Sequence, residues 1–220
     1  MENNCDKMDS MDFGFQNSVI LNEKANSIYF NGNITPSTMS TLIQKLLELE
    51  RIILKKQKKL KRKFDDFQKD KNDCSEAENL LEVTIKPKPI MLYITSNGGY
   101  VYQVFTAIDT IHSMKVPVHT ICKGFVASAG TLLSLAGMKR YITENSYMLI
   151  HELRTSSWGK FTQIAESFDN AKQLMEHIKQ YYVKNTLMTY EELDEQLKKD
   201  ICWDAEMCIK KGLADEIFTA

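Results

Sequence analysis

The sequence predicts an α/β fold in which helices pack against a parallel sheet. Two apolar runs, residues 89–95 and 116–122, have the length and composition of strands that are buried on both faces. Each run is followed by a helical pattern, through residues 102–111 and residues 127–138. Because strands that alternate with helices form parallel βαβ units, this order of segments predicts a parallel sheet.

The segments around this centre have their own signals. Residues 27–34 (SIYFNGNI) predict a short strand and a turn, and residues 139–143 and 147–152 predict two further strands. A helix is expected to begin at Thr35 and Pro36. The hydroxyl of Thr35 can cap the first turn, and proline at the first helical position loses no hydrogen bond.

Further helices follow from apolar spacing and capping residues. A stripe at helical spacing continues the helix from Pro36: Met39, Leu42, Ile43, Leu46, Leu47, Leu49, Ile52 and Ile53. A long helix is expected over about residues 160–188, and a shorter one over residues 190–199. Asp204 is expected to cap a last helix that stops at Gly212.

A charged segment separates the first helix from the first buried strand. Residues 51–63 contain eight basic residues and no acidic one, whereas residues 65–82 contain seven acidic residues and two lysines. One interpretation is a solvated helical extension and loop whose charges partly pair. The other is a docking element for an acidic partner or nucleic acid, but the basic run lacks interleaved aromatic residues before Phe64. We interpret residues 50–86 as a charged helical insertion.

Composition limits the compartment and the partners. The 220 residues suit one domain of moderate size, and a net charge of −1 gives no general attraction to nucleic acid or anionic membranes. The five cysteines are scattered and lack CxxC spacing, which favours reduced thiols over disulfides or zinc. The acidic start is unlike a secretory signal, and no apolar run reaches the roughly 18 residues of a membrane span. We expect a cytoplasmic protein without metal or cofactor.

Ser128 is the candidate nucleophile. It lies in GFVASAG (124–130), between a predicted buried strand and a predicted helix. Free N–H groups at the start of a helix favour a developing oxyanion, and the small neighbouring residues leave room for a substrate carbonyl. A small-residue helix start is equally explained by close packing, and a serine hydroxyl needs a base before it can attack.

His151 is the best candidate for that base. It ends the predicted strand YMLI, and functional groups of α/β proteins gather at the carboxyl ends of parallel strands. The other three histidines lie inside predicted elements: His112, His119 and His177. The turn SNGG (96–99) also follows the end of a strand. Its glycines suit a tight turn, and the N–H groups of Gly99 and Ala129 could form an oxyanion hole.

At these places the sequence resembles the proteolytic subunit of the Clp protease, a family of serine peptidases. Four segments match in order across residues 89–218: YITSNGG, ICKGFVASAGTLLSLAG, YMLIHE and DICWDAEMCIKKGLADEI. The resemblance implies Ser128 as nucleophile, His151 as general base, and Asp200 as the carboxylate that orients it. It also implies an oxyanion hole formed by the N–H groups of Gly99 and Ala129. By residue type alone, Asp194 or Asp204 would serve as well as Asp200.

The resemblance also implies a fold and an assembly. The fold would be a crotonase-like spiral of βαβ units, and residues 17–220 would form the peptidase domain after a flexible tail (1–16). Two stacked rings, possibly of seven subunits each, would enclose the sites, and an AAA+ unfoldase would supply unfolded proteins or peptides. The helix at 160–188 would be the handle that interlocks the rings. Its apolar residues would be buried there: Phe161, Ile164, Phe168, Leu174 and Ile178.

Several positions depart from the family pattern. Asn97 stands where the family usually has proline, and Ala129 where methionine is common. After the histidine, the sequence HELRTSSWGK replaces the more usual His-Gln-Pro. These changes leave the catalytic groups in place but alter the expected substrate cleft. Two other functions stay open: a non-catalytic ring subunit of a mixed assembly, and an acyl-CoA enzyme of crotonase type. The intact serine, histidine and aspartate favour the peptidase.

Overall fold

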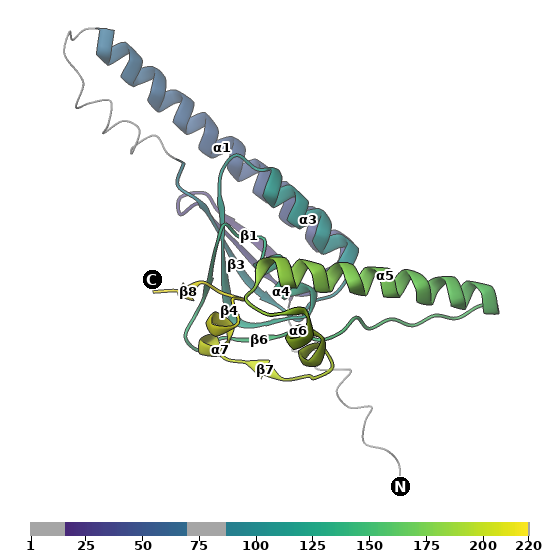
Figure 1. Cartoon of the computed structure of the whole chain (residues 1–220). Helices are drawn as coiled ribbons and strands as arrows, with labels where there is room; N and C mark the ends of the chain where they lie inside the picture. Colours follow the sequence, from purple (N-terminus) through teal and green to yellow (C-terminus); the bar gives the residue numbers. More distant parts are fainter. Residues whose placement is uncertain (1–15, 70–86, 220) are drawn as a thin grey trace.

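An eight-stranded sheet forms the centre of the computed structural model, which describes residues 16–69 and 87–219 (Figure 1). Its strands are β1 (Ser18–Asn22), β2 (Ser27–Asn31), β3 (Ile90–Ser96), β4 (Val118–Ala127), β5 (Lys139–Ile142), β6 (Tyr147–Leu149), β7 (Cys202–Trp203) and β8 (Glu216–Ile217). They follow the order β1-β2-β3-β4-β5-β8, with β6 beside β4 and β7 beside β6. Neighbours from β2 to β8 pair in parallel, which confirms the predicted parallel sheet.

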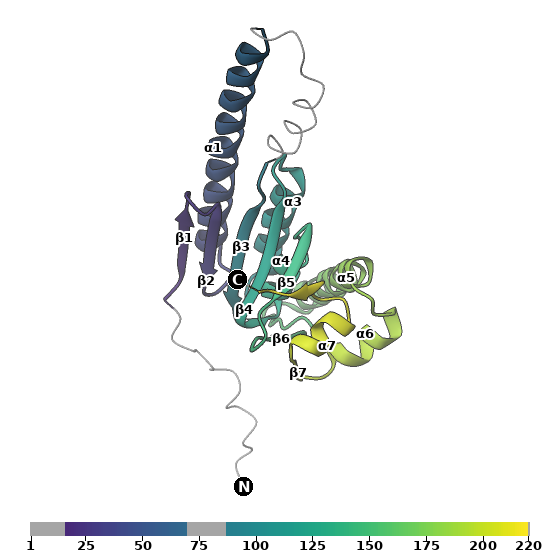
Figure 2. The same cartoon turned by 90° about the vertical axis from the view of Figure 1, so that its left-hand side faces the viewer.

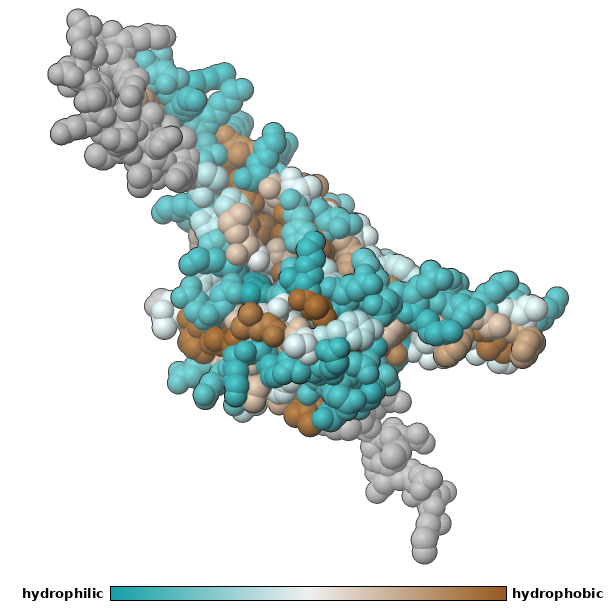
Figure 3. Space-filling model, in the orientation of Figure 1, coloured by the Kyte–Doolittle hydropathy of each residue, from teal (hydrophilic) through white to brown (hydrophobic). Residues whose placement is uncertain are grey.

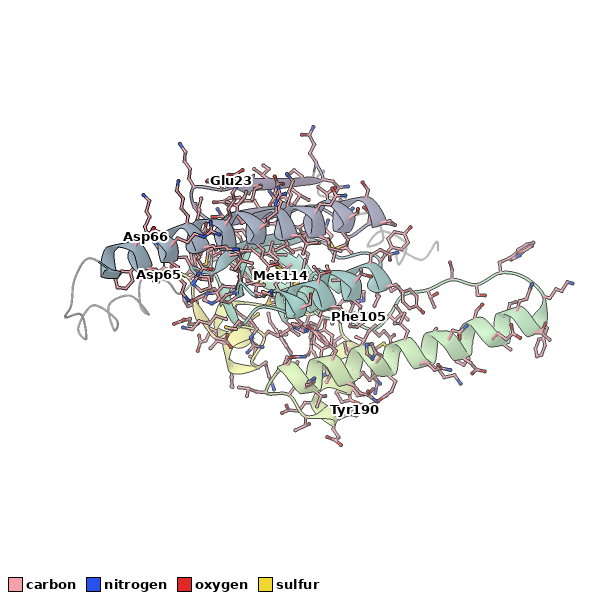
Figure 4. All side chains as sticks on the ribbon, turned by 90° about the horizontal axis from the view of Figure 1, so that it is seen from above. Glu23, Asp65, Asp66, Phe105, Met114 and Tyr190 are labelled. Atoms are coloured by element: carbon pink, nitrogen blue, oxygen red, sulfur yellow. The ribbon has the colours of Figure 1, made fainter. Side chains whose placement is uncertain are left out.

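Helices cover the sheet and extend beyond it. They are α1 (Pro36–Lys69), α3 (Val101–Ser113), α4 (Ala129–Ser134), α5 (Phe161–Asn185), α6 (Tyr190–Leu197) and α7 (Ala205–Lys210). Helices α1 and α3 lie side by side, and Phe105 of α3 contacts His177 and Tyr181 of α5, with ring centroids 4.7 and 5.7 Å apart (Figure 4). Within residues 16–69 and 87–219, no helix is both long and apolar enough to cross a membrane.

Helix α1 begins as predicted and then leaves the core. The Thr35 hydroxyl accepts a hydrogen bond from the Thr38 N–H at 3.1 Å, so Thr35 caps the first turn. Most of the predicted stripe is buried or partly buried as far as Ile53, although Leu47 is 46% exposed, and every lysine and arginine in residues 55–63 is exposed. This basic part projects past the strands and has a largely hydrophilic surface (Figures 2 and 3). The amino-terminal tail (1–15) and the acidic stretch 70–86 lie outside the described residues.

The boundary between β4 and α4 differs from the sequence prediction. The helix was expected over residues 127–138, but β4 continues to Ala127 and α4 contains only the six residues Ala129–Ser134. Phe125, Val126 and Ala127 pair with β6, so sheet hydrogen bonds override the helical pattern there. Strands β1, β7 and β8 were not predicted. Strands β7 and β8 contain two residues each, which is too short for a periodic pattern, and β1 has only partly buried or exposed residues.

Strand β4 changes its pairing partner at a bulge. Residues 119–122 pair with β5, whereas residues 125–127 pair with β6. Between these two parts the register against β3 shifts, and Gly124 adopts a positive φ of 70°. A residue without Cβ accepts this conformation at little cost. The bulge therefore carries the end of β4 to β6, where the candidate site begins.

The two halves of α1 should contribute very differently to stability. Leu46 is fully buried, so Leu46→Ala should lower the free energy of unfolding by about 2–5 kcal/mol. Leu60 is 52% exposed on the projecting part, so Leu60→Ala should change the free energy of unfolding by less than about 0.5 kcal/mol. Urea denaturation of both variants measures this difference. An equal loss in Leu60→Ala would show that the projecting part is packed in solution.

Candidate active site

Ser128 lies in a strained turn between β4 and α4. Its backbone has φ 54° and ψ −129°, a region that residues with a Cβ rarely adopt and that costs on the order of 1–3 kcal/mol. Hydrogen bonds hold the turn on both sides. The Ser128 N–H donates to the Leu149 carbonyl at 2.8 Å, and the Ser128 carbonyl accepts from the Thr131 N–H at 2.9 Å and the Thr131 hydroxyl at 2.7 Å.

The turn after β3 packs directly against Ser128. Gly98 has φ 93°, and a Cβ at this position would lie 2.6 Å from the Ser128 Cβ. The next glycine, Gly99, approaches the backbone of Ile34 and forms a parallel bridge with it. Within the described chain, the N–H groups of Gly99 and Ala129 donate no hydrogen bond. Both groups are therefore available to an acceptor at this edge of the sheet.

Two strand pairings bring His151 to the same edge. Strand β6 runs parallel to β4, with Ala127 opposite Leu149, so His151 follows just beyond the end of the pairing. Strand β7 runs antiparallel to β6, with Leu149 opposite Cys202. Continuing this register by two residues places His151 opposite Asp200. The two pairings thus place His151 near the end of β4 and bring the segment that contains Asp200 next to β6.

One cavity of about 290 Å³ collects most of the predicted site. Ser128, His151, Gly99 and Ala129 all line it. Its inner wall is apolar and consists of buried or partly buried side chains: Val101, Leu132, Leu153, Ile178 and Tyr182. A polar rim with two free N–H groups beside an apolar wall suits a substrate that presents a carbonyl and an apolar side chain.

Asp200 does not line this cavity in the structure. Its carboxylate accepts a hydrogen bond from the Arg154 guanidinium, with 3.0 Å between Nη2 and Oδ2. His151 Nδ1 is buried without a hydrogen-bond partner, although the charge of Asp200 is near enough to influence the His151 pKa. No hydrogen bond joins His151 to the Ser128 hydroxyl among the residues described. In this structure no hydrogen bond therefore joins Ser128, His151 and Asp200 to one another.

The surroundings of His151 favour its neutral form. Burial lowers the pKa of the imidazole below its usual 6.5, and the positive charge of Arg154 lowers it further. The negative charge of Asp200 acts in the opposite direction but is the smaller influence. A neutral imidazole is the form that accepts a proton, so the site is electrostatically prepared for a general base.

The other aspartates and histidines have structural roles of their own. Asp194 forms ion pairs with Lys179 and Lys198, and Asp204 caps α7 by accepting from the Met207 N–H at 2.8 Å. His119 lies on β4 beside Tyr141, and His177 packs on Phe105. Of the three aspartates that residue type left open, Asp200 is the one whose charge influences the His151 pKa.

Sequence reasoning missed two residues of the site. Arg154 lies within the altered stretch after His151 and lines the cavity, but nothing in the sequence places its side chain there. Asn97 lines the same cavity, and its Oδ1 is buried without a hydrogen-bond partner. Its position in SNGG, where the family usually has proline, was the only available signal.

A scan against known protein families matches residues 67–220 to the family described as Clp protease. The match covers most of the 220 residues and includes β3, α4, β6 and the whole candidate site. The chain belongs to the Clp protease family. Clp proteases are in general serine peptidases that act in ring assemblies together with Clp ATPases and cleave peptides. The recognition made from four sequence segments is thereby confirmed.

In this Clp protease, Gly98→Ala should be far more costly than Gly124→Ala. Both glycines have positive φ, so either alanine costs about 1–2 kcal/mol of strain. At Gly124 the nearest neighbouring atom is 4.0 Å from the added Cβ, whereas at Gly98 the Cβ would collide with Ser128. The collision should lower the free energy of unfolding by about 1–3 kcal/mol more, as measured by urea denaturation. Equal losses would contradict this packing.

The charges beside His151 should shift its titration in opposite directions. Asp200→Asn removes a charge that raises the His151 pKa, so the pKa should fall further below 6.5. Arg154→Gln removes a charge that lowers it, so the pKa should rise. NMR titration of the imidazole protons in the wild type and both variants measures these shifts. Shifts in the same direction in both variants would contradict the charge arrangement.

Proposed function

We propose that the chain is a serine endopeptidase core that hydrolyses peptide bonds of unfolded proteins. One observation carries the proposal. A serine in a strained strand-to-helix turn, a histidine held in its neutral form and two unused N–H groups line a single cavity. Hydrolysis of an acyl compound by a serine needs these parts together: a nucleophile, a base and donors for the oxyanion.

The roles follow from the chemistry of acyl transfer. His151 takes the Ser128 proton as Oγ attacks the substrate carbonyl, and the N–H groups of Gly99 and Ala129 hold the oxyanion. The imidazolium then gives its proton to the leaving amine, and an acyl-enzyme remains. Water repeats the sequence and releases the acid. Asp200 orients His151 through Nδ1, which requires its carboxylate to turn from Arg154 toward the imidazole.

The proposed assembly follows the family. Residues 17–220 would form one peptidase domain of crotonase-like spiral architecture with a charged insertion at 50–86, in stacked rings within the cytoplasm, served by an AAA+ unfoldase. Helix α5 would be the handle. Its far half supports this assignment, because Phe161 and Phe168 are 87% and 63% exposed, whereas Ile178 is buried. The free end of α5 shows this apolar surface in Figure 3.

A second candidate is a ring subunit that contributes structure without catalysis. The observation that favours it is the lack of hydrogen bonds between the three groups, with Asp200 engaged by Arg154 and His151 Nδ1 unpaired. Under this alternative the chain would assemble into rings but would never form an acyl-enzyme.

Ser128→Ala should abolish peptide hydrolysis. Removing the nucleophile of a serine peptidase lowers kcat by about 10⁴-fold or more. Hydrolysis of fluorogenic peptides and labelling by a fluorophosphonate probe measure the loss, with light scattering to verify assembly. Ser113→Ala is the matched control, because this serine is exposed at the end of α3 and away from the cavity. Hydrolysis that survives in Ser128→Ala would refute the peptidase assignment, and an assembled wild type that never labels would favour the structural subunit.

A further inference from the structure

Arg154 stands where the site cavity meets a second, larger cavity. The second cavity has a volume of about 620 Å³ and lies between the turn after β3, the stretch after His151 and α5. The two cavities share four lining residues: Gly99, Val101, Leu153 and Arg154. A peptide bound at Ser128 that continues into the larger cavity would therefore pass the Arg154 side chain.

Arg154 carries the permanent positive charge where the two cavities meet. The other residues that line the larger cavity are uncharged. The site cavity adds only His151 and the carboxylate of Glu152 to the groups that can carry charge. Among the lining residues described, Arg154 is thus the one permanent cation. Guanidinium groups bind carboxylates well because their planar N–H donors match the two oxygens.

One partner of Arg154 is the carboxylate of Asp200, which we propose as the residue that orients His151. Asp200 accepts from Arg154 at 3.0 Å, and its side chain is 44% exposed while that of Arg154 is 56% exposed. Ion pairs exposed to this degree contribute little to stability, so another carboxylate can replace Asp200 at small cost. The orientation of the pair also leaves His151 Nδ1 without an acceptor.

We propose that Arg154 binds an acidic side chain of the substrate next to the scissile bond, and that this exchange releases Asp200 to His151. The inference rests on the proposed peptidase function and names the peptides that the site prefers. Arg154 is a specificity-determining residue toward the substrate and a positioning residue toward Asp200. Binding of a peptide with this acidic side chain thus also allows Asp200 to contact His151.

The test compares peptide pairs that differ by glutamate or glutamine at one position. Fluorogenic peptides carry the pair at each of the two positions on either side of the cleaved bond, and the full chain is assayed at pH 8. At one position the glutamate peptide should have a kcat/KM about three- to tenfold higher, the range for a partly exposed ion pair with hydrogen bonds. In Arg154→Gln the ratio should fall to about one, and Arg154→Lys should restore part of it.

Two further measurements separate recognition from a general effect of charge. Lys199→Gln removes a positive charge beside Asp200 in the sequence but outside both cavities, and it should leave the peptide preference unchanged. In Arg154→Gln without peptide, fluorophosphonate labelling of Ser128 should be about two- to fivefold faster, because Asp200 is no longer held away. Labelling that is unchanged or slower would overturn the release of Asp200.

The outcomes distinguish acidic recognition by Arg154 from the proposed peptidase function on which it rests. A wild type that labels at Ser128 and cleaves both peptides of every pair equally would overturn acidic recognition and leave the peptidase intact. A wild type that neither labels nor cleaves would refute the peptidase, and the preference with it. The wild-type peptide comparison needs no variant, so a failure of Arg154→Gln to fold does not remove the test.

Discussion

The hydrogen bond from the Ser128 N–H to the Leu149 carbonyl closes the last pairing between β4 and β6. It fixes the strained turn at Ser128 to the strand that ends just before His151. The strain is sustained because backbone groups on both sides of the turn are satisfied at once. The positions of Ser128 and His151 thus depend on one backbone contact, and the bulge at Gly124 allows β4 to reach it.

The remaining part of the site is held less firmly. Strand β7 pairs with β6 and so brings its chain near His151. Asp200 lies two residues before β7, and its side chain is exposed. The Glu152 N–H donates to the Leu197 carbonyl at 2.9 Å, which fixes the backbone after His151, whereas the Arg154 side chain is 56% exposed. A hydrogen-bonded backbone therefore carries an exposed ion pair between Arg154 and Asp200.

The sequence predicted the parts of this structure that depend on local pattern. The buried strands, the cap at Thr35 and the serine and histidine at strand ends all have local signals in residue type and spacing. The extension of β4 through Ala127 depends on pairing with β6, and the ion pair of Arg154 with Asp200 joins residues 46 positions apart. Such contacts arise from tertiary packing, and no periodic pattern encodes them. The role of Asp200 had to come from the family resemblance for the same reason.

The length of the stretch from Gly124 to Ser128 is also constrained by the fold. It begins at the bulge, where β4 leaves β5, and it ends at Ser128, so its length sets how far Ser128 lies from the bulge. Substitutions within it change packing, whereas the loss or gain of one residue would reverse which face each following side chain occupies. In evolution and in protein engineering, the residues between Gly124 and Ser128 should accept changes of residue type more readily than changes of length.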